Sequence, residues 1–207
     1  MIKTASFADL PAIAACHCAA FPGALSSAMG ERYVARMLSW YLSGDKTFLF
    51  FFEKNGICAG YCGGMIADGV LPTGSASGML RHSMGTALRS FALRPWLVFH
   101  PELRAKYPLI WRNMAYALGF RSRKRAAKAK AREWVPGAGL VVIGTHPGYR
   151  VQGIGSALLD EFERRAVEVY GMRRMYLSVR PDNQTAIRAY ERKGWVCVGV
   201  GQYEKLK

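Results

Sequence analysis

One stretch decides the fold of this chain: His146-Pro147-Gly148-Tyr149-Arg150-Val151-Gln152-Gly153-Ile154-Gly155-Ser156-Ala157-Leu158. An apolar strand ends just before it, Pro147 stops that strand, and two glycines two positions apart open a helix. The first turn of a helix binds phosphate well, because it carries free N–H groups and the positive end of the helix dipole. Gly153 and Gly155 let a pyrophosphate approach the backbone, and Arg150 adds charge at the rim.

A glycine-rich junction between a strand and a helix has competing explanations. It can be a tight turn with no ligand. A P-loop requires Gly-Lys-Ser or Gly-Lys-Thr, which this junction lacks. The dinucleotide fingerprint requires a third glycine, which this junction lacks, and usually an acidic residue at the end of the next strand. The pattern therefore favours phosphate binding of a different kind.

The segments around this loop alternate between strand and helix. They are expected as strand 139–145, helix 156–170, strand 175–179, helix 184–193 and a final strand 195–200. The expected inward residues of the first helix are Leu158, Leu159, Phe162 and Val167. This alternation predicts a parallel strand pair at the centre of a sheet.

The N-terminal part adds helices and a hairpin. An extended segment at residues 1–5 leads into Ser6-Phe7-Ala8-Asp9, which resembles a capping box and predicts a helix start. Phe21-Pro22-Gly23 ends that helix, and a second amphipathic helix follows. The next segments are strands 47–53 and 57–66, joined by Lys54-Asn55-Gly56. Asn-Gly is a favoured hairpin turn.

Residues 68–136 differ in character from the rest. Gly, Ser and Pro punctuate helical patterns at 79–93 and 109–120, and residues 121–132 hold seven bases and no acid. We interpret the segment as a basic helical insertion. The whole chain, residues 1–207, is then expected to form one domain that this insertion interrupts.

Composition bounds the classes of protein. About half of the residues are hydrophobic, which argues against global disorder, and no apolar run approaches the ~20 residues of a membrane-spanning helix. The start of the sequence has no signal-peptide pattern, so the cytoplasm is the expected compartment. The five cysteines lack the spacing of a zinc site, so we expect reduced thiols and no metal. A formal charge of +15 attracts anions.

Two motifs in order resemble the GNAT superfamily of N-acetyltransferases. Arg-x-x-Gly-x-Gly at 150–155 is similar to its coenzyme A signature. Asn183, Ala186, Tyr190 and Gly194-Trp195 are similar to its second motif. The N-terminal strand, helices and hairpin fit as well. The resemblance covers roughly residues 1–66 and 137–207 and leaves the insertion outside.

This resemblance implies an α/β (α+β) fold with a mixed, mostly antiparallel sheet, splayed at its centre and flanked by helices. It implies an acyltransferase that moves an acetyl group from acetyl-CoA, as cosubstrate, to a primary amine of a small acceptor such as an amino sugar. The strand at Ile143, Gly144 and Thr145 would bind the pantetheine arm, and Asn183 a pantetheine amide. The coenzyme-binding residues it implies are Ile143, Gly144, Thr145, Arg150, Val151, Gln152, Gly153, Ile154, Gly155, Ser156 and Asn183.

Tyr190 is the residue that the resemblance implies as catalytic. Expulsion of coenzyme A from a thioester leaves a thiolate, and a positioned phenol can protonate it. Asn183 and Tyr190 are seven positions apart, about two helical turns, so helical spacing places them near one face. The alternative for Tyr190 is an aromatic residue of the core with its hydroxyl at the edge.

The sequence lacks an obvious general base. Relatives often carry a glutamate at two positions that align here with Val141 and Ser178, and neither is a base. The amine can then lose its proton to ordered water or to a distant side chain. Alternatively, a positive field can lower the pKa of the amine, so that its neutral form is present. The candidates for the distant side chain are Glu31, His82 and Glu133, while His146 is expected to shape the loop.

The role of the insertion stays open at this stage. Around Trp96 and Phe99, aromatic and aliphatic residues alternate with bases such as Arg94 and Arg104. The segment can be an added helical subdomain, an amphipathic surface for anionic lipid at the inner face of the membrane, or a surface for an anionic acceptor such as a nucleotide-linked amino sugar. No recognised nucleic-acid module is present, which argues against nucleic acid. Two rivals remain: a non-catalytic coenzyme A-binding module, and a basic membrane- or RNA-associated protein on the same scaffold.

Overall fold

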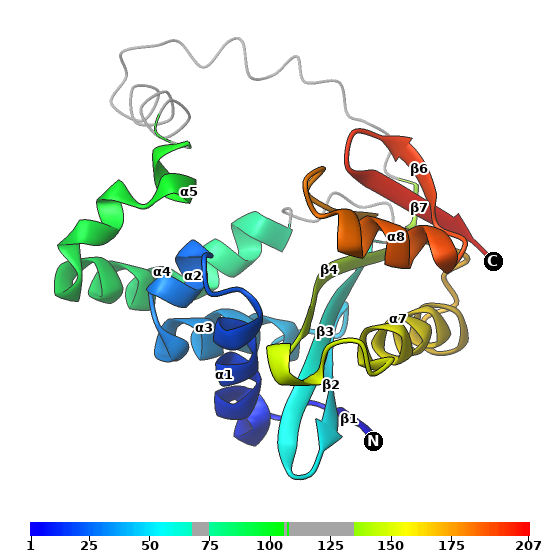
Figure 1. The fold of residues 1–207 in the computed structure, drawn as a ribbon, viewed down its shortest axis with the longest axis horizontal. Coiled ribbons are helices and arrows are strands. Elements are labelled where there is room, and N and C mark those ends of the chain that lie inside the picture. The colour runs from blue at the N-terminus through cyan, green and yellow to red at the C-terminus, as the bar shows by residue number, and fades with distance from the viewer. Residues whose placement is uncertain (68–74, 106, 108–134) are drawn as a thin grey trace.

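A computed structural model describes residues 1–67, 75–105, 107 and 135–207. The described residues form one mixed seven-stranded sheet in the order β1-β2-β3-β4-β5-β7-β6 (Figure 1). The strands are β1 Ile2–Thr4, β2 Thr47–Lys54, β3 Ile57–Ala67, β4 Gly137–Thr145, β5 Arg174–Ser178, β6 Val196–Gly199 and β7 Gln202–Leu206. Only β4 and β5 pair in parallel, at the centre, as the alternation of strand and helix predicts.

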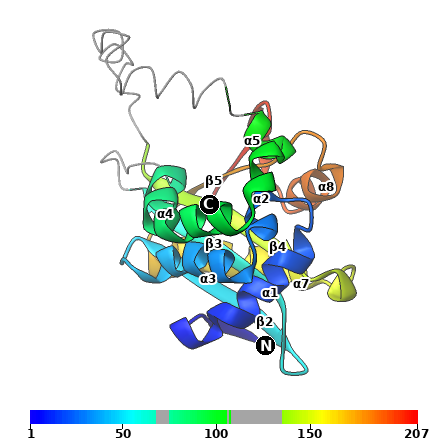
Figure 2. The same ribbon diagram turned by 90° about the vertical axis from the view of Figure 1, so that its left-hand side faces the viewer.

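Helices cover both faces of the sheet. The described α-helices are α1 Leu10–Ala20, α2 Leu25–Ala28, α3 Glu31–Leu38, α4 Ser75–Leu93, α5 Pro101–Arg104, α7 Ile154–Arg164 and α8 Gln184–Arg192. The short helical turns are η1 Phe7–Asp9, η2 Ser39–Leu42, η3 Pro95–Phe99, η5 Pro147–Tyr149 and η6 Arg165–Val169. One core packs α7 and α8 on the sheet, and a second packs α1, α3 and α4 on its other face (Figures 1 and 2). None of the described helices is long and apolar enough to cross a membrane.

The N-terminal expectations are confirmed. Asp9 Oδ2 accepts hydrogen bonds from the Ser6 backbone N–H at 2.8 Å and the Ser6 hydroxyl at 2.6 Å, as in a capping box. Helix α1 ends at Ala20, directly before the Phe-Pro-Gly break. In the β2–β3 hairpin, Asn55 and Gly56 have φ angles of 53° and 75°. Two successive positive φ angles are those of the type I′ turn that Asn-Gly favours.

Two expectations for the C-terminal part are wrong in detail. The helix after the glycine loop begins at Ile154 rather than at 156, and its last turn, η6, is a π-helix. Ala166 is fully buried where Val167 was expected, and Val167 is half-buried, because ordinary helical spacing carries the buried side from Phe162 and Glu163 to Ala166.

The expected final strand is also corrected, because two strands stand there. β6 is the edge strand, and β7, which sequence patterning missed, lies between β5 and β6. Its sequence, Gln-Tyr-Glu-Lys-Leu, shows little apolar alternation, since Tyr203 is its only buried residue. Gly201, with φ of 65°, makes the turn between the two strands.

The described part of the insertion is helical, as expected, in α4, η3 and α5. Of its predicted amphipathic residues, Leu97 is buried while Trp96 and Phe99 are exposed. The expected helix at 109–120, the basic run at 121–132 and Glu133 lie outside the described residues.

A buried ionic cluster ties α7 to the C-terminal hairpin. Glu163 is 3% exposed, and its carboxylate accepts hydrogen bonds from Trp195 Nε1 at 3.0 Å and from Lys205 Nζ at 2.7 and 2.8 Å. Lys207 Nζ lies 3.1 Å from the same carboxylate. Removing one partner of such a cluster leaves buried charge without compensation, which costs far more than loss of a surface pair.

We therefore expect Glu163→Gln to lower the free energy of unfolding by about 3 kcal/mol. Glu168→Gln is the matched control on the same segment, because Glu168 pairs with Arg164 at the surface and its loss should cost less than about 1 kcal/mol. Urea unfolding followed by circular dichroism measures both. Equal losses of unfolding free energy in the two variants would contradict the assignment of Glu163 as the centre of a buried ionic cluster.

Candidate functional site

The central feature of the site is the separation of β4 from β5. β4 pairs with β5 only through Ala138, Gly139 and Leu140, whereas it pairs with β3 up to Thr145. The register against β3 shifts after Leu140, which leaves Val141 as an extra residue in β4. Such a bulge bends and twists a strand. The main-chain groups of residues 143–145 on the β5 side are therefore left without a strand partner, as the splayed sheet requires.

The loop after β4 places a run of backbone N–H groups at the start of α7. Within the described part of the chain, no hydrogen bond uses the N–H groups of residues 151–156. Val151 has φ of 62° and Gly153 has φ of 76°. A positive φ is strained for a β-branched residue, and strain of this kind collects at ligand sites. The arrangement fits a diphosphate, which accepts several N–H hydrogen bonds at a positive helix end.

Side chains hold this loop in place. His146 Nδ1 accepts from Gly148 N–H at 3.2 Å, so His146 shapes the loop as expected. Lys54, in the hairpin turn, donates to Gln152 Oε1 at 2.7 Å. Arg150, expected at the phosphate rim, donates to the Ala20 carbonyl oxygen at 3.2 Å and so caps the end of α1. The loop is thereby connected to both faces of the sheet.

Asn183 lies just before α8 and caps it. Its Oδ1 accepts from Ala186 N–H at 3.2 Å. Asn183 is therefore outside the helix, exposed, and the simple helical spacing to Tyr190 does not describe it. Its side-chain NH₂ group makes no hydrogen bond with the described residues and can donate to a ligand.

Tyr190 lies on the inner side of α8. It is 7% exposed and packs near the rings of Trp195 and Tyr203, with centroids 6.2 and 6.4 Å away. Burial raises the pKa of Tyr190 to about 12. The phenol therefore stays protonated at neutral pH and can act as a proton donor but not as a base. Packing alone also explains its burial, so the position fits both readings of this residue.

The two candidate bases with described positions, Glu31 and His82, lie on α3 and α4 rather than on the strands of the splay. Val141 is the bulged residue of β4, and Ser178 is exposed at the end of β5. Glu31 is exposed at the start of α3. His82 Nε2 is 2.8 Å from the Ser39 hydroxyl. Burial is the main cause that lowers the pKa of His82, and the positive charge of Arg36 lowers it further. His82 therefore has a packing role between α4 and η2.

Sequence reasoning missed a buried hydrogen-bonded chain beside the site. His17, 6% exposed, has Nδ1 2.5 Å from the Tyr61 hydroxyl and Nε2 2.9 Å from the Ser26 hydroxyl. Tyr61 pairs with Gly144 across β3 and β4, and a Cβ on Gly144 would come within 3.0 Å of Phe21 and Tyr61. The signal was present in the sequence, because His17 follows Ile13 by four positions on the buried face of α1.

Glu102 on α5 was also missed. Its Oε2 accepts from Leu25 N–H at 3.1 Å, at the start of α2, and its Oε1 accepts from Arg180 Nη2 at 2.5 Å, just after β5. This carboxylate connects the described insertion to both the α1–α2 corner and the end of the splayed strand. The described part of residues 68–136 therefore reaches the end of the splayed strand, as its place in the sequence predicted.

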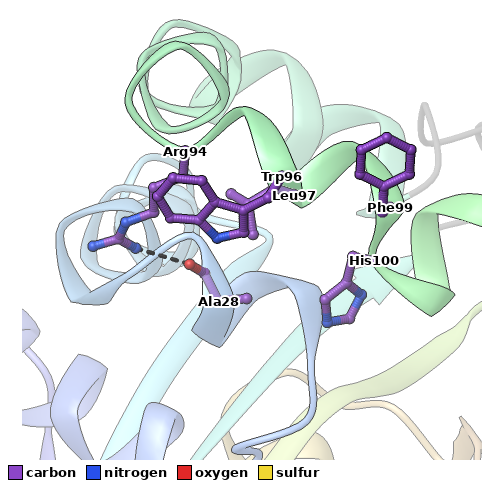
Figure 3. Close-up of a pocket in the computed structure, with 6 residues that line it drawn as sticks. All are labelled: Ala28, Arg94, Trp96, Leu97, Phe99 and His100. Carbon is purple, nitrogen blue, oxygen red and sulfur yellow. Dashed lines mark hydrogen bonds between the residues drawn. The ribbon is translucent and has the colours of Figure 1, made fainter.

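A hollow opens between α2 and η3 (Figure 3). It is lined by Ala28, Arg94, Trp96, Leu97, Phe99 and His100. The Arg94 guanidinium donates to the Ala28 carbonyl oxygen at 2.8 Å, so it closes one side (Figure 3). None of the predicted coenzyme residues lines this hollow, so it is separate from the splay. Among the residues with described positions, no group of three or more His, Cys, Asp or Glu side chains is arranged to hold a metal ion.

Solved structures of acetyltransferases share this fold. One described as an acetyltransferase has a TM-score of 0.57 and 18% identity over 100% of this chain and 98% of its own. An N-acetyltransferase from Staphylococcus aureus Mu50 has a TM-score of 0.56 and 17% identity over 100% and 98%. Aminoglycoside N-acetyltransferase AAC(6')-Iy, in complex with CoA, has a TM-score of 0.52 and 13% identity over 96% and 93%. A search of curated proteins found no match.

A splayed mixed sheet with a glycine-containing loop at the start of α7 fits the class of coenzyme A-dependent acyltransferases. The model of the acetyltransferase (GNAT) family matches residues 87–195, more than half of the chain, and includes both motifs. The chain belongs to this family. It is an acetyl-CoA-dependent GNAT N-acetyltransferase.

The buried His17 gives a pH-dependent stability. Burial lowers the pKa of His17 from 6.5 to about 4. Between these values the unfolded chain binds a proton that the folded chain does not, so stability rises with pH. We expect His17 to contribute roughly 3 kcal/mol to the free energy of unfolding above pH 6.5, and this contribution to be lost as the pH falls toward 4.

Urea unfolding of the wild type, His17→Gln and His100→Gln between pH 4 and 7 measures this dependence. The difference between wild type and His17→Gln should shrink toward low pH, and His100→Gln should keep the wild-type slope. A constant difference between wild type and His17→Gln across this range would rule the linkage out.

Proposed function

We propose that acetyl-CoA binds in the splay between β4 and β5. The N–H groups of residues 151–156 bind its diphosphate, with Arg150 adjacent, and the main chain of Ile143, Gly144 and Thr145 binds its pantetheine arm. The observation that carries this proposal is the run of N–H groups that the described residues leave without partners at the start of α7. The unpaired edge of β4, which is long enough for a second row of hydrogen bonds, supports it.

Asn183, which caps α8, and Tyr190, within α8, complete the proposed site. The Asn183 side chain, held by its hydrogen bond to Ala186, presents its NH₂ group to a pantetheine carbonyl. Tyr190 provides the proton for the leaving group. The attacking nitrogen forms a bond to the thioester carbonyl carbon and loses a proton to solvent. The carbon–sulfur bond then breaks with its electron pair on sulfur, the phenol protonates that thiolate, and solvent returns a proton to the phenolate. Its pKa of about 12 supports this role, since the proton is present at working pH.

The amine is deprotonated without a carboxylate at the two usual strand positions. Val141 and Ser178 occupy them. We propose that ordered water removes the proton and that the positive field of the protein favours the neutral amine. Catalysis then rests on proximity and on hydrogen bonds from the β4 main chain to the developing oxyanion.

The proposed acceptor is a primary amine on a small, anionic molecule, an amino sugar or a related metabolite. Two of the similar structures are aminoglycoside N-acetyltransferases, and this chain resembles them in fold. Aminoglycosides carry several positive charges. A chain with a formal charge of +15 repels such molecules and attracts anionic ones. We therefore favour an acceptor with phosphate or carboxylate groups.

The proposed organisation is one domain, residues 1–207, interrupted at about 68–136, acting in the cytoplasm. Incubation with acetyl-CoA and a metabolite extract, followed by mass spectrometry, tests the activity and names the acceptor. An acetylated primary amine is expected. Release of coenzyme A with no acetylated product, or no turnover at all, would overturn the proposed acceptor class.

Gly155 offers a test of the diphosphate site that is separate from stability. It lies in the first turn of α7, and a Cβ there would meet only Thr145 Oγ1, at an ordinary 3.5 Å. Gly155→Ala should therefore leave stability unchanged or raised, because alanine favours a helix. We expect the methyl group to weaken coenzyme A binding at least tenfold, because it enters the space of the phosphates.

Titration calorimetry with coenzyme A measures that loss. Gly85→Ala is the matched control, since Gly85 lies in α4 with no atom within 4 Å of its Cβ position. It should gain helix stability and bind coenzyme A as the wild type does. Wild-type affinity in Gly155→Ala would place the diphosphate elsewhere.

Tyr190→Phe tests the proposed acid. We expect kcat to fall about 100-fold with the coenzyme A Kd unchanged, because only the hydroxyl is lost. Wild-type activity should not decline between pH 7 and about 9.5, since the phenol keeps its proton there. Tyr170→Phe, a half-buried tyrosine of the same core, is the control and should keep wild-type kcat. An undiminished kcat in Tyr190→Phe would return Tyr190 to a packing role.

A further inference from the structure

Helix α4 and the turn η3 carry a row of exposed large apolar side chains. Trp96 and Phe99 are 63% and 73% exposed, and Leu88 and Leu93 are 62% and 66% exposed. Exposed arginines accompany them. We call this set the docking face: Leu80, Arg81, Met84, Leu88, Arg89, Leu93, Trp96 and Phe99.

The pattern on α4 departs from that of an ordinary surface helix. Its inner side, with Ala87 and Ser83, packs on the helices of the second core. Leu80, Met84 and Leu88 follow one another at intervals of four residues on the outer side, so they form one exposed apolar line. A helix that only covers a core presents polar residues outward. An apolar line with bases beside it marks an interaction surface.

The charge of this face is one-sided. Glu102 is the only acidic residue in the described segment 75–105, and it is engaged by Leu25 N–H and Arg180. Neither Arg81 nor Arg89 has an ion-pair partner among the residues whose positions are described. The partner must therefore present negative charge to the arginines and an apolar region that the Leu, Trp and Phe side chains can enter.

We infer that the docking face binds the surface of an anionic lipid bilayer. Aliphatic and aromatic side chains enter the boundary between headgroups and acyl chains, while arginines meet anionic headgroups. A second copy of the chain fits less well, because the two faces would bring their arginines together in molecules of +15 formal charge. RNA fits less well, because Leu80, Met84, Leu88 and Leu93 offer it neither charge nor a stacking ring.

This docking leaves the coenzyme loop accessible. The face belongs to the helices of the second core, whereas the loop of residues 151–156 opens α7, which packs on the opposite side of the sheet (Figures 1 and 2). Through Glu102, the same segment contacts the α1–α2 corner and Arg180 at the end of the splay. A bilayer would therefore lie on the side of the molecule where Glu102 meets Arg180, at the end of β5. The inference does not depend on the proposed acceptor or on the role of Tyr190.

Co-sedimentation of the full chain with vesicles tests the inference. The vesicles are pure phosphatidylcholine, or phosphatidylcholine with phosphatidylglycerol, at salt concentrations of about 0.1 and 0.5 M, where screening differs strongly. We expect binding to the anionic vesicles that weakens at high salt. Leu88→Ser/Trp96→Ser/Phe99→Ser should weaken it at least tenfold, and Arg81→Gln/Arg89→Gln at least fivefold.

Matched controls lie on other surfaces. Val196→Thr/Val198→Thr/Val200→Thr alters three exposed apolar residues at and beside β6, and Arg188→Gln/Arg192→Gln removes the same charge from α8. We expect both control variants to bind vesicles more tightly than the corresponding docking-face variants. Coenzyme A affinity, measured in parallel, shows that every variant is folded.

Any of the following results would overturn the inference that this face binds anionic lipid. Absence of wild-type binding to anionic vesicles would do so, as would equal losses in the docking-face variants and their controls. Wild-type binding by the Leu88, Trp96 and Phe99 variant would place lipid contact elsewhere, including the residues outside the described ranges. Binding to an unstructured RNA with none to lipid, or concentration-dependent dimerisation lost in that variant, would assign the face to those partners instead.

Discussion

The separation of β4 from β5 is the constraint on which the rest of the site depends. A strand buried between two neighbours normally pairs all of its main-chain groups. Here the extra residue at Val141 bends β4 after three pairs with β5, and the strand continues along β3 alone. Unpaired main-chain groups in the middle of a sheet require another partner, and we propose acetyl-CoA as that partner.

The two cores support the two sides of this opening independently. On one side, α7 and α8 fix the loop after β4 and Tyr190, and the Glu163 cluster fastens them to the C-terminal hairpin. On the other, α1, α3 and α4 bury His17 against Tyr61 beside Gly144. Arg150 joins the loop after β4 to the end of α1, and Lys54 at the end of β2 joins the same loop, each through a single hydrogen bond. Most of the rigidity at the site therefore comes from buried packing, with polar side chains fixing the loop itself.

The positive charge of the chain has no single explanation in the fold. Several bases are engaged in local structure, such as Arg94 with the Ala28 carbonyl oxygen and Arg180 with Glu102. Others, such as Arg81 and Arg89, project from α4 beside exposed apolar residues. The electrostatic field of the whole protein concentrates anions around the molecule. A local amphipathic surface instead makes direct contact with one partner.

The sequence by itself determined the elements whose signals are local. The glycines at 153 and 155, the Asn-Gly turn, the Ser6–Asp9 capping box and the two motifs predicted the loop, the hairpin, the first helix and the family. Tertiary structure alone decided what local signals do not encode. The strand β7 lacks an apolar alternation, the helix after the loop ends in a π turn, and the contacts of Glu102 and Arg150 join residues far apart in the chain. Local propensity acts over a few residues, whereas these features depend on which distant surface each segment meets.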